Sequence, residues 1–236
     1  MGDELKETRA NEWYVPRFGP PRFRLLLGMT FFPYTLMNVS YTVIGSLLAE
    51  QVHTDRLVGI AVVYLFAVGM TAHGLDAMAP NKPWGSFLTR KQLTVLVAAG
   101  LIPSFTLGLY YSVRYAPWLL VVGVVELFFL LSYNLELFGS RFHTKGWFAL
   151  SWGFLPVLGG YVLQTNSIST LAIAGGLFGF STAYVEISAS QPYKAIMKKQ
   201  TGAAATQARR LEYVLKGVVS SVLFLAAALL FYRLLR

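Results

Sequence analysis

His73, Asp76 and Lys82 stand where the apolar run of residues 57–79 ends, in a chain in which only 13% of the residues are charged. An ordinary membrane span closes with aromatic residues and one or two lysines. His73 and Asp76 are three residues apart, so on a helix they share one face. Ionisable groups at membrane depth are costly, and each one is therefore a candidate functional site.

A second helix ending has a similar order of residues. Asp76 is followed by a proline and, two residues after the proline, by Lys82; Glu186 is followed by a proline and, again two residues later, by Lys194. The two endings lie 110 residues apart and are predicted on one side of the membrane, so we expect them to face one cavity. Mg²⁺ takes hard oxygen ligands and lysines neutralise phosphate charge, so two acids with two lysines would suit a diphosphate.

Further polar residues lie within the apolar runs. Most of them fall toward the same predicted side of the membrane as Asp76 and Glu186, and Glu126 stands mid-span. They group by run as Tyr34, Asn38, Tyr41 and Thr42 in residues 24–49, Glu126, Tyr133 and Glu136 in residues 117–137, and Tyr184 and Glu186 in residues 168–189.

Each candidate also has a purely structural explanation. Asp76 and Glu186 would pair with the lysines that follow them, as charges at a helix end. His73 would bond a backbone carbonyl within the core. Glu126 would be protonated, or held by a neighbouring helix for packing alone. The aromatic residues would fill the core and form an interfacial belt.

Helices must position these residues. Hydrophobic residues make up 55% of the 236-residue chain, and the charged fraction is about half that of soluble domains. Runs of about 20 apolar residues indicate membrane-spanning helices. The sequence predicts an all-α polytopic membrane bundle of about seven transmembrane helices, with a polar tail over residues 1–22 and one domain over 23–236. The runs are residues 24–49, 57–79, 93–113, 117–137, 146–164, 168–189 and 214–235.

The basic residues define the predicted topology. The tail and the second, fourth and sixth loops hold sixteen of the twenty lysines and arginines. By the positive-inside rule the N-terminus is cytoplasmic in an integral protein of the cell membrane. The net charge of +9 therefore reflects topology, and a nucleic-acid partner is not expected. Because cysteine is absent, disulfides, thiolate nucleophiles and Cys-ligated metals are excluded.

The chain resembles the UbiA superfamily of intramembrane prenyltransferases over about residues 20–200. Residues 153–161 read GFLPVLGGY, where the family has G-x-x-P-V-L-G-x-Y, and Tyr133 and Arg141 precede them. Residues 82–89 read KPWGSFLT, similar to the segment that follows the family's first Asp-rich motif. Residues 20–24 read PPRFR, similar to the start of its first helix.

The chain departs from the family at both Asp-rich motifs. The first, N-D-x-x-D-x-x-x-D, falls on residues 72–80, where Asp76 alone remains and His73 replaces an aspartate. The second, D-x-x-x-D, becomes Glu186 with Ser190. A divergent branch of the family has H-x-x-D in place of N-D-x-x-D, and the segment from His73 to Asp76 resembles this form more closely. We therefore expect at most one weakly held divalent ion, and about seven helices where the family has nine.

The resemblance implies a membrane-embedded prenyltransferase that acts on a prenyl diphosphate. Asp76 and Glu186 would bind Mg²⁺, and His73 would serve as a base or a third ligand. The other implied site residues are Lys82, Arg141 and Lys194 for the diphosphate, and Asn38, Tyr133, Glu136 and Tyr184 in the cavity wall.

The alternative is a non-catalytic relative that binds a quinone, a carotenoid or another prenyl lipid. The lost acids favour it, and a membrane-protein partner would then cover the flank that two missing helices leave apolar. A retinal protein is disfavoured because Lys216 lies at the very start of the last run, with no lysine at mid-span. A haem protein is disfavoured because His53, His73 and His143 fall at helix ends or in loops.

Overall fold

The computed structural model describes residues 12–79, 88–197 and 202–235, and the secondary structure of these residues is entirely helical. The segments α4, η1 and α5 follow one another without a break, as do α8, η3 and α9, where η marks a π-helical segment. The described chain therefore forms an all-α bundle of seven main helices, as predicted, with α2 as a short additional helix. The elements are α2 (Pro21–Met29), α3 (Phe32–Leu47), α4 (Thr54–Phe66), η1 (Ala67–Ala72), α5 (His73–Met78), α6 (Arg90–Arg114), α7 (Trp118–Asn134), α8 (Lys145–Ala149), η3 (Leu150–Phe154), α9 (Leu155–Thr165), α10 (Thr170–Met197) and α11 (Gly202–Leu234).

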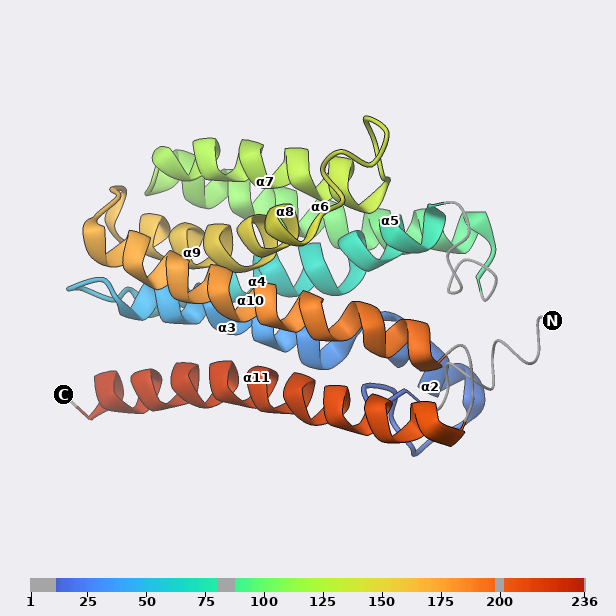
Figure 1. The fold of residues 1–236 in the computed structure, drawn as a ribbon. Coiled ribbons are helices and arrows are strands. Elements are labelled where there is room, and N and C mark those ends of the chain that lie inside the picture. Colours follow the sequence, from blue (N-terminus) through green and yellow to red (C-terminus); the bar gives the residue numbers. More distant parts are fainter. Residues whose placement is uncertain (1–11, 80–87, 198–201, 236) are drawn as a thin grey trace.

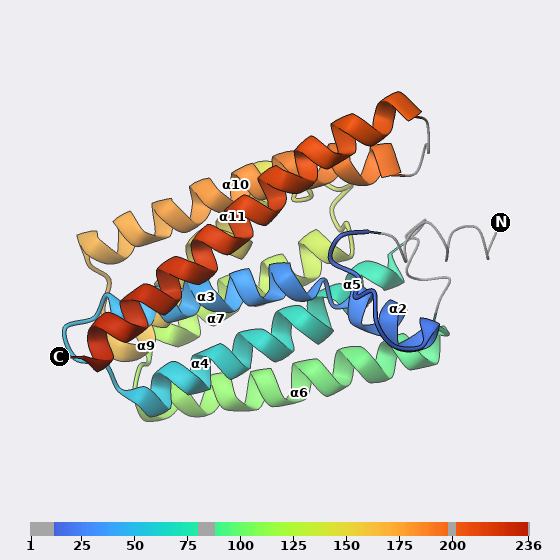
Figure 2. The same cartoon turned by 90° about the horizontal axis from the view of Figure 1, so that it is seen from below.

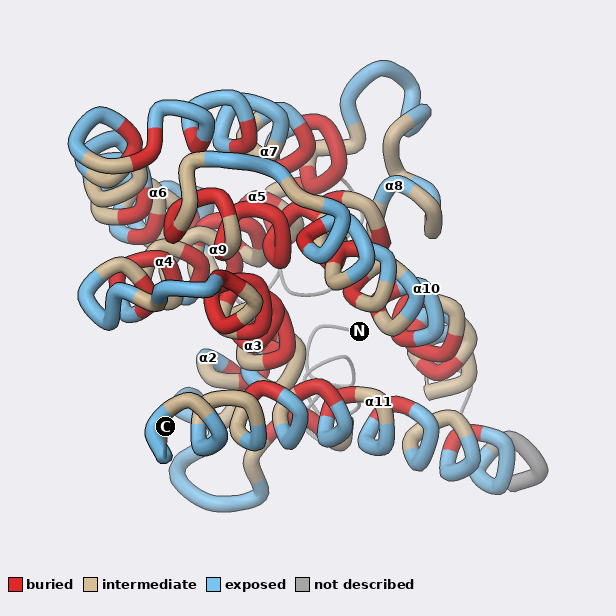
Figure 3. The backbone as a smooth tube through the Cα atoms, turned by 90° about the vertical axis from the view of Figure 1, so that its left-hand side faces the viewer, coloured by how far each residue is buried: buried red, intermediate tan, exposed pale blue. Residues whose placement is uncertain are grey.

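The outer face of the bundle is apolar. Five helices within the described residues are long and apolar enough to cross a membrane, and α7 is apolar but only 17 residues long. Buried residues line the inside of the bundle, whereas the outer sides of α6, α7 and α11 are exposed (Figure 3). Ile102, Val124 and Phe224 are examples of these exposed side chains, at 65%, 67% and 73%. Such a surface is suited to lipid, which indicates an integral membrane protein.

Three predicted helix boundaries differ from the structure. The run 24–49 divides into α2 and α3 because Phe31 has a left-handed backbone (φ 45°), and Pro33 lies in the first turn of α3. The helix expected over 168–189 continues to Met197 with Pro192 inside it, so Lys194 lies on α10 and not in a loop. The last helix begins at Gly202, well before residue 214. The hydrophobic run indicates only the part of the helix at membrane depth, whereas the Ala-rich residues before it also favour helix.

Helix α3 lies at the centre of the bundle and packs on α4, α9 and α11 (Figures 2 and 3). Its contact with α9 is a backbone contact: a Cβ added at Gly45 would lie 1.9 Å from the carbonyl oxygen of Val157, and one added at Gly160 would lie 2.1 Å from that of Thr42. Small residues allow such close approach between membrane helices. These glycines fix the position of α3 against α9.

The two acid-bearing helix ends lie at the same end of the bundle. The end of α5, the end of α10, the start of α11 and helix α2 all lie there, while the C-terminus lies at the opposite end (Figure 1). We call the end of the bundle that holds α2 and the start of α11 the N-terminal end. The helices that carry Asp76 and Glu186 thus have their C-terminal ends at the same end of the bundle, although they are far apart in sequence.

Candidate functional site

A cavity of about 340 Å³ opens among α3, α5, α7, η3 and α10, and we call it the polar cavity. Six of the ten site residues proposed from the sequence line it. They are Asn38, His73, Asp76, Tyr133, Glu186 and Lys194.

Helix α10 contributes one face to the polar cavity. Glu186, Ser190 and Lys194 follow one another at intervals of four residues, so they share a side of the helix, and all three line the cavity. Glu186 is only 6% exposed. The Lys194 ammonium lies 4.6 Å from the centre of the Phe31 ring, within range of a cation–π interaction. The continuation of α10 past Pro192 is what places this lysine beside the carboxylate.

His73 is held by α3 from across the cavity. Its Nε2 lies 3.3 Å from the Thr35 hydroxyl, and that hydroxyl donates to the carbonyl of Thr30 at 2.8 Å. The hydroxyl therefore accepts from Nε2–H, which leaves Nδ1 as the acceptor nitrogen of the neutral ring. Asp76 lies one turn further on and also lines the cavity. The partner of His73 is therefore a hydroxyl, and not the backbone carbonyl expected for a purely structural histidine.

Asn38 joins α3 to the π-helical segment η3. Its Nδ2 donates to the carbonyl of Trp152 at 2.7 Å. Its amide oxygen is buried and has no hydrogen-bond partner among the residues that the structure describes. A buried acceptor without a partner is rare. Asn38 is thus a polar residue of the cavity wall whose amide nitrogen is used within the bundle.

Tyr133 is paired with a residue that the sequence analysis did not assign to the site. The ring of His143 stacks on the Tyr133 ring with 4.3 Å between centroids, and its Nδ1 lies 2.9 Å from the Tyr133 carbonyl oxygen. His143 also lines the polar cavity. It comes from the loop after α7, and no sequence spacing relates it to the helical candidates, so only the fold of that loop brings it to the site.

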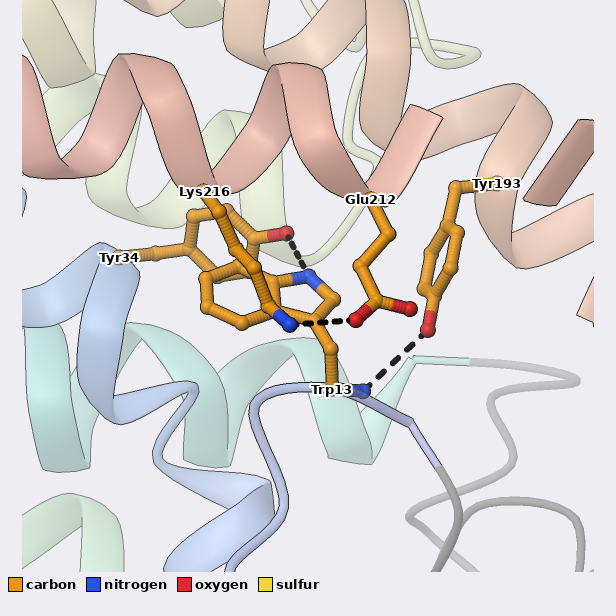
Figure 4. Close-up of polar contacts among 5 residues, drawn as sticks. All are labelled: Trp13, Tyr34, Tyr193, Glu212 and Lys216. Carbon is orange, nitrogen blue, oxygen red and sulfur yellow. Dashed lines mark hydrogen bonds and ion pairs between the residues drawn. The ribbon is translucent and has the colours of Figure 1, made fainter. Parts of the chain in front are cut away.

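The segment that precedes α2 packs beside the cavity. The Trp13 backbone N–H donates to the Tyr193 hydroxyl, and its indole N–H donates to the Tyr34 hydroxyl, both at 3.2 Å (Figure 4). Lys216 of α11 lies 5.9 Å from the Trp13 ring centre and pairs with Glu212 at 2.5 Å. Since Tyr34 also lines the polar cavity, this part of the predicted tail supports the cavity wall.

The remaining proposed residues lie elsewhere. Glu136 sits in the turn after α7 with a left-handed backbone (φ 54°), and Arg141 is exposed in the loop that follows. Tyr184 is 43% exposed on α10. None of these three is in the wall of the polar cavity. Lys82 lies outside the described residues.

Glu126 belongs to a different cavity. It accepts a hydrogen bond from the Tyr64 hydroxyl of α4 and lines a second, apolar cavity of about 330 Å³ between α4, α6 and α7. A purely structural Glu126 was expected to be either protonated or held by a neighbouring helix. The structure shows such a partner on a neighbouring helix, Tyr64 of α4.

The donor set of the polar cavity fits a metal ion only in part. The described residues contain no group of three or more His, Cys, Asp or Glu side chains that could hold an ion. Mg²⁺ is, however, commonly bound through one or two carboxylates together with substrate phosphates and water. Asp76 and Glu186 both line the cavity, and the Mg²⁺ assignment stays a prediction.

Comparison with protein-family models, with curated proteins and with solved structures finds no match to this chain.

Proposed function

We propose that this protein binds a prenyl diphosphate in the polar cavity and transfers its prenyl group, as a divergent relative of the UbiA prenyltransferases. The observation that carries the proposal is the meeting of Asp76 and Glu186, from two distant helices, with Lys194 in one cavity of an apolar bundle. The local sequence resemblance supports it independently. On this proposal the N-terminal end of the bundle faces the cytoplasm, where prenyl diphosphates are soluble.

The charge of the cavity argues for a particular form of the ligand. Asp76 and Glu186 carry two negative charges when ionised, and Lys194 carries one positive charge. A bare diphosphate would be repelled by such a wall. Asp76 and Glu186 would hold a divalent ion, and its charge would offset this repulsion. We therefore expect binding to require Mg²⁺, which, when bound, would neutralise charge on the diphosphate as it departs.

The residues of the chain itself have distinct roles in this proposal. The bond between the allylic carbon and the diphosphate oxygen breaks, and its electron pair leaves with the diphosphate, which Lys194 stabilises. The Tyr133 ring, which lines the cavity, would stabilise the resulting cation. The acceptor molecule attacks the allylic carbon and releases a proton, and Nδ1 of His73 takes it.

Release of diphosphate tests the proposal. Purified protein in lipid nanodiscs is incubated with farnesyl diphosphate, Mg²⁺ and a lipid extract that supplies the acceptor. We expect Asp76→Asn to abolish release, and Lys194→Met to lower the affinity for farnesyl diphosphate. Lys91→Met is the matched control, because Lys91 is exposed at the start of α6 and lies outside the cavity wall. Absence of release from the wild-type protein would contradict the proposed transfer.

A non-catalytic isoprenoid-binding protein is the second candidate. It is favoured by the small metal-ligand set and by the position of Arg141, which is exposed outside the cavity wall. Mass spectrometry of the purified protein distinguishes the two. A quinone, carotenoid or other prenyl lipid that co-purifies, with no turnover of farnesyl diphosphate, supports this candidate.

A further inference from the structure

The second cavity is a crevice that is suited to hydrocarbon, and we call it the apolar crevice. Its wall is mostly aliphatic, from α4, α6, α7 and η3. The serine hydroxyls in the wall are already used: Ser104 donates to Gly100, Ser112 to Gly108 and Ser151 to Trp147, at 2.7–2.8 Å. The one carboxylate in the wall, that of Glu126, already accepts a hydrogen bond from Tyr64. The rest of the wall offers little to a polar ligand and can bury apolar surface.

The apolar crevice is elongated and reaches the lipid-facing surface. On α7 it extends from Leu119 to Leu130, which at the rise of an α-helix corresponds to about 16 Å. Exposed side chains at its rim include Phe105 and Val124, at 57% and 67%. A hydrocarbon chain can therefore lie along the helices and enter from the bilayer.

The apolar crevice adjoins the polar cavity. Val68 and Trp152 line both. Val68 lies on η1 and Trp152 lies on η3, so each shared residue stands on a π-helical segment. π-helical turns occur frequently at functional sites, where they change the direction of side chains. The Asn38 bond to the Trp152 carbonyl fixes one side of this junction.

Two glycines leave space in the apolar crevice. Gly108 and Gly123 line it, and a Cβ added at either would have no heavy atom within 4 Å. Close helix packing accounts for glycine at positions 45 and 160, but it does not account for glycine at positions 108 and 123. Glycine costs about 1 kcal/mol relative to alanine inside a helix. Their position instead keeps the volume of the crevice open.

We infer that the apolar crevice holds the hydrocarbon tail of the same isoprenoid whose polar end occupies the polar cavity, with Val68 and Trp152 at the neck between them. The inference rests on the proposed function. It makes the crevice between α4, α6 and α7, with Gly123 in its wall, the determinant of prenyl chain length.

A chain-length series tests the inference. The affinities of wild-type protein in nanodiscs for geranyl, farnesyl and geranylgeranyl diphosphate are measured with Mg²⁺ and compared with those of Gly123→Leu. We expect Gly123→Leu to keep the affinity for geranyl diphosphate and to lower the affinity for geranylgeranyl diphosphate about tenfold. A loss of that size corresponds to about two methylene groups that are no longer buried. Gly217→Leu is the matched control, since Gly217 is a helical glycine with equally open surroundings on α11.

The outcomes separate the inference from the proposed function. Wild-type protein that binds none of the three diphosphates refutes the proposed function and the inference with it. If the wild-type protein binds the diphosphates and Gly123→Leu shows the same dependence of affinity on chain length, the inference is overturned while the proposed function stands. A farnesyl diphosphate analogue with a photoreactive group at the tail end gives a second measurement: we expect cross-links to residues 101–130, and cross-links confined to α10 or α11 would overturn the inference.

Discussion

Gly45→Ala should weaken the bundle although it adds only one methyl group. The new Cβ would lie 1.9 Å from the carbonyl oxygen of Val157, whereas ordinary contacts begin at 3.4 Å. Because protein interiors are close-packed, α3 and α9 would have to part locally by about 1.5 Å. Overpacking of this kind costs about 2 kcal/mol, and the gain in helix propensity from alanine, about 1 kcal/mol, offsets part of it.

The expected result is a net loss of about 1 kcal/mol in the free energy of unfolding, which for a chain of this size lowers the midpoint by about 3 °C. Thermal unfolding of the protein in one detergent, followed by circular dichroism, measures it. Gly217→Ala serves as the control, because open surroundings leave only the propensity gain, and its midpoint should stay equal or rise. A Gly45→Ala midpoint at or above that of Gly217→Ala would refute the close α3–α9 contact.

Three other predictions follow from described contacts. Tyr64→Phe removes the donor to Glu126 and should lower the free energy of unfolding by about 1 kcal/mol, measured as above; an unchanged midpoint would show that the bond contributes nothing. Trp13→Ala removes the indole ring and its hydrogen bond to Tyr34, drawn in Figure 4, while the backbone N–H that donates to Tyr193 remains; limited proteolysis should still cleave the N-terminal segment faster, and an unchanged rate would contradict the packing of the ring. Because the chain has no cysteine, single cysteines at Lys91 and Ser167 can be labelled without background, and an impermeant reagent should reach them from opposite sides of the membrane; labelling from one side would contradict the transmembrane arrangement.

The apolar runs predicted the seven main helices. Of the about seven transmembrane helices expected, five of those described are long and apolar enough to cross a bilayer, because α3 and α7 have only 16 and 17 residues. The break at Phe31 was not predictable in the same way. Phe31 has a left-handed backbone, and its ring packs against Tyr14 and His73, with ring centroids 4.8 Å away in each case; a hydropathy pattern carries no information on such contacts. Pro192 was interpreted as the end of a helix, since proline favours helix ends, but α10 continues through it.

The candidate site was predictable where chemistry lies on helices at regular spacing. His73 with Asp76, and Glu186 with Lys194, could be identified because ionisable residues are rare in apolar runs. His143 reaches the cavity only through the loop after α7. The apolar crevice had no sequence signal, because aliphatic residues that line a cavity have the same composition as those that fill a core.

The central claim is that Asp76 and Glu186 serve one ligand in one cavity. A double-mutant cycle on the affinity for farnesyl diphosphate tests it most directly, with wild type, Asp76→Asn, Glu186→Gln and the double variant measured with and without Mg²⁺. We expect wild-type binding to depend on Mg²⁺ and each single change to weaken it. The double variant should lose less than the two single losses together, as for residues that share a partner. Binding that is independent of Mg²⁺, or single losses that simply add, would contradict a shared site.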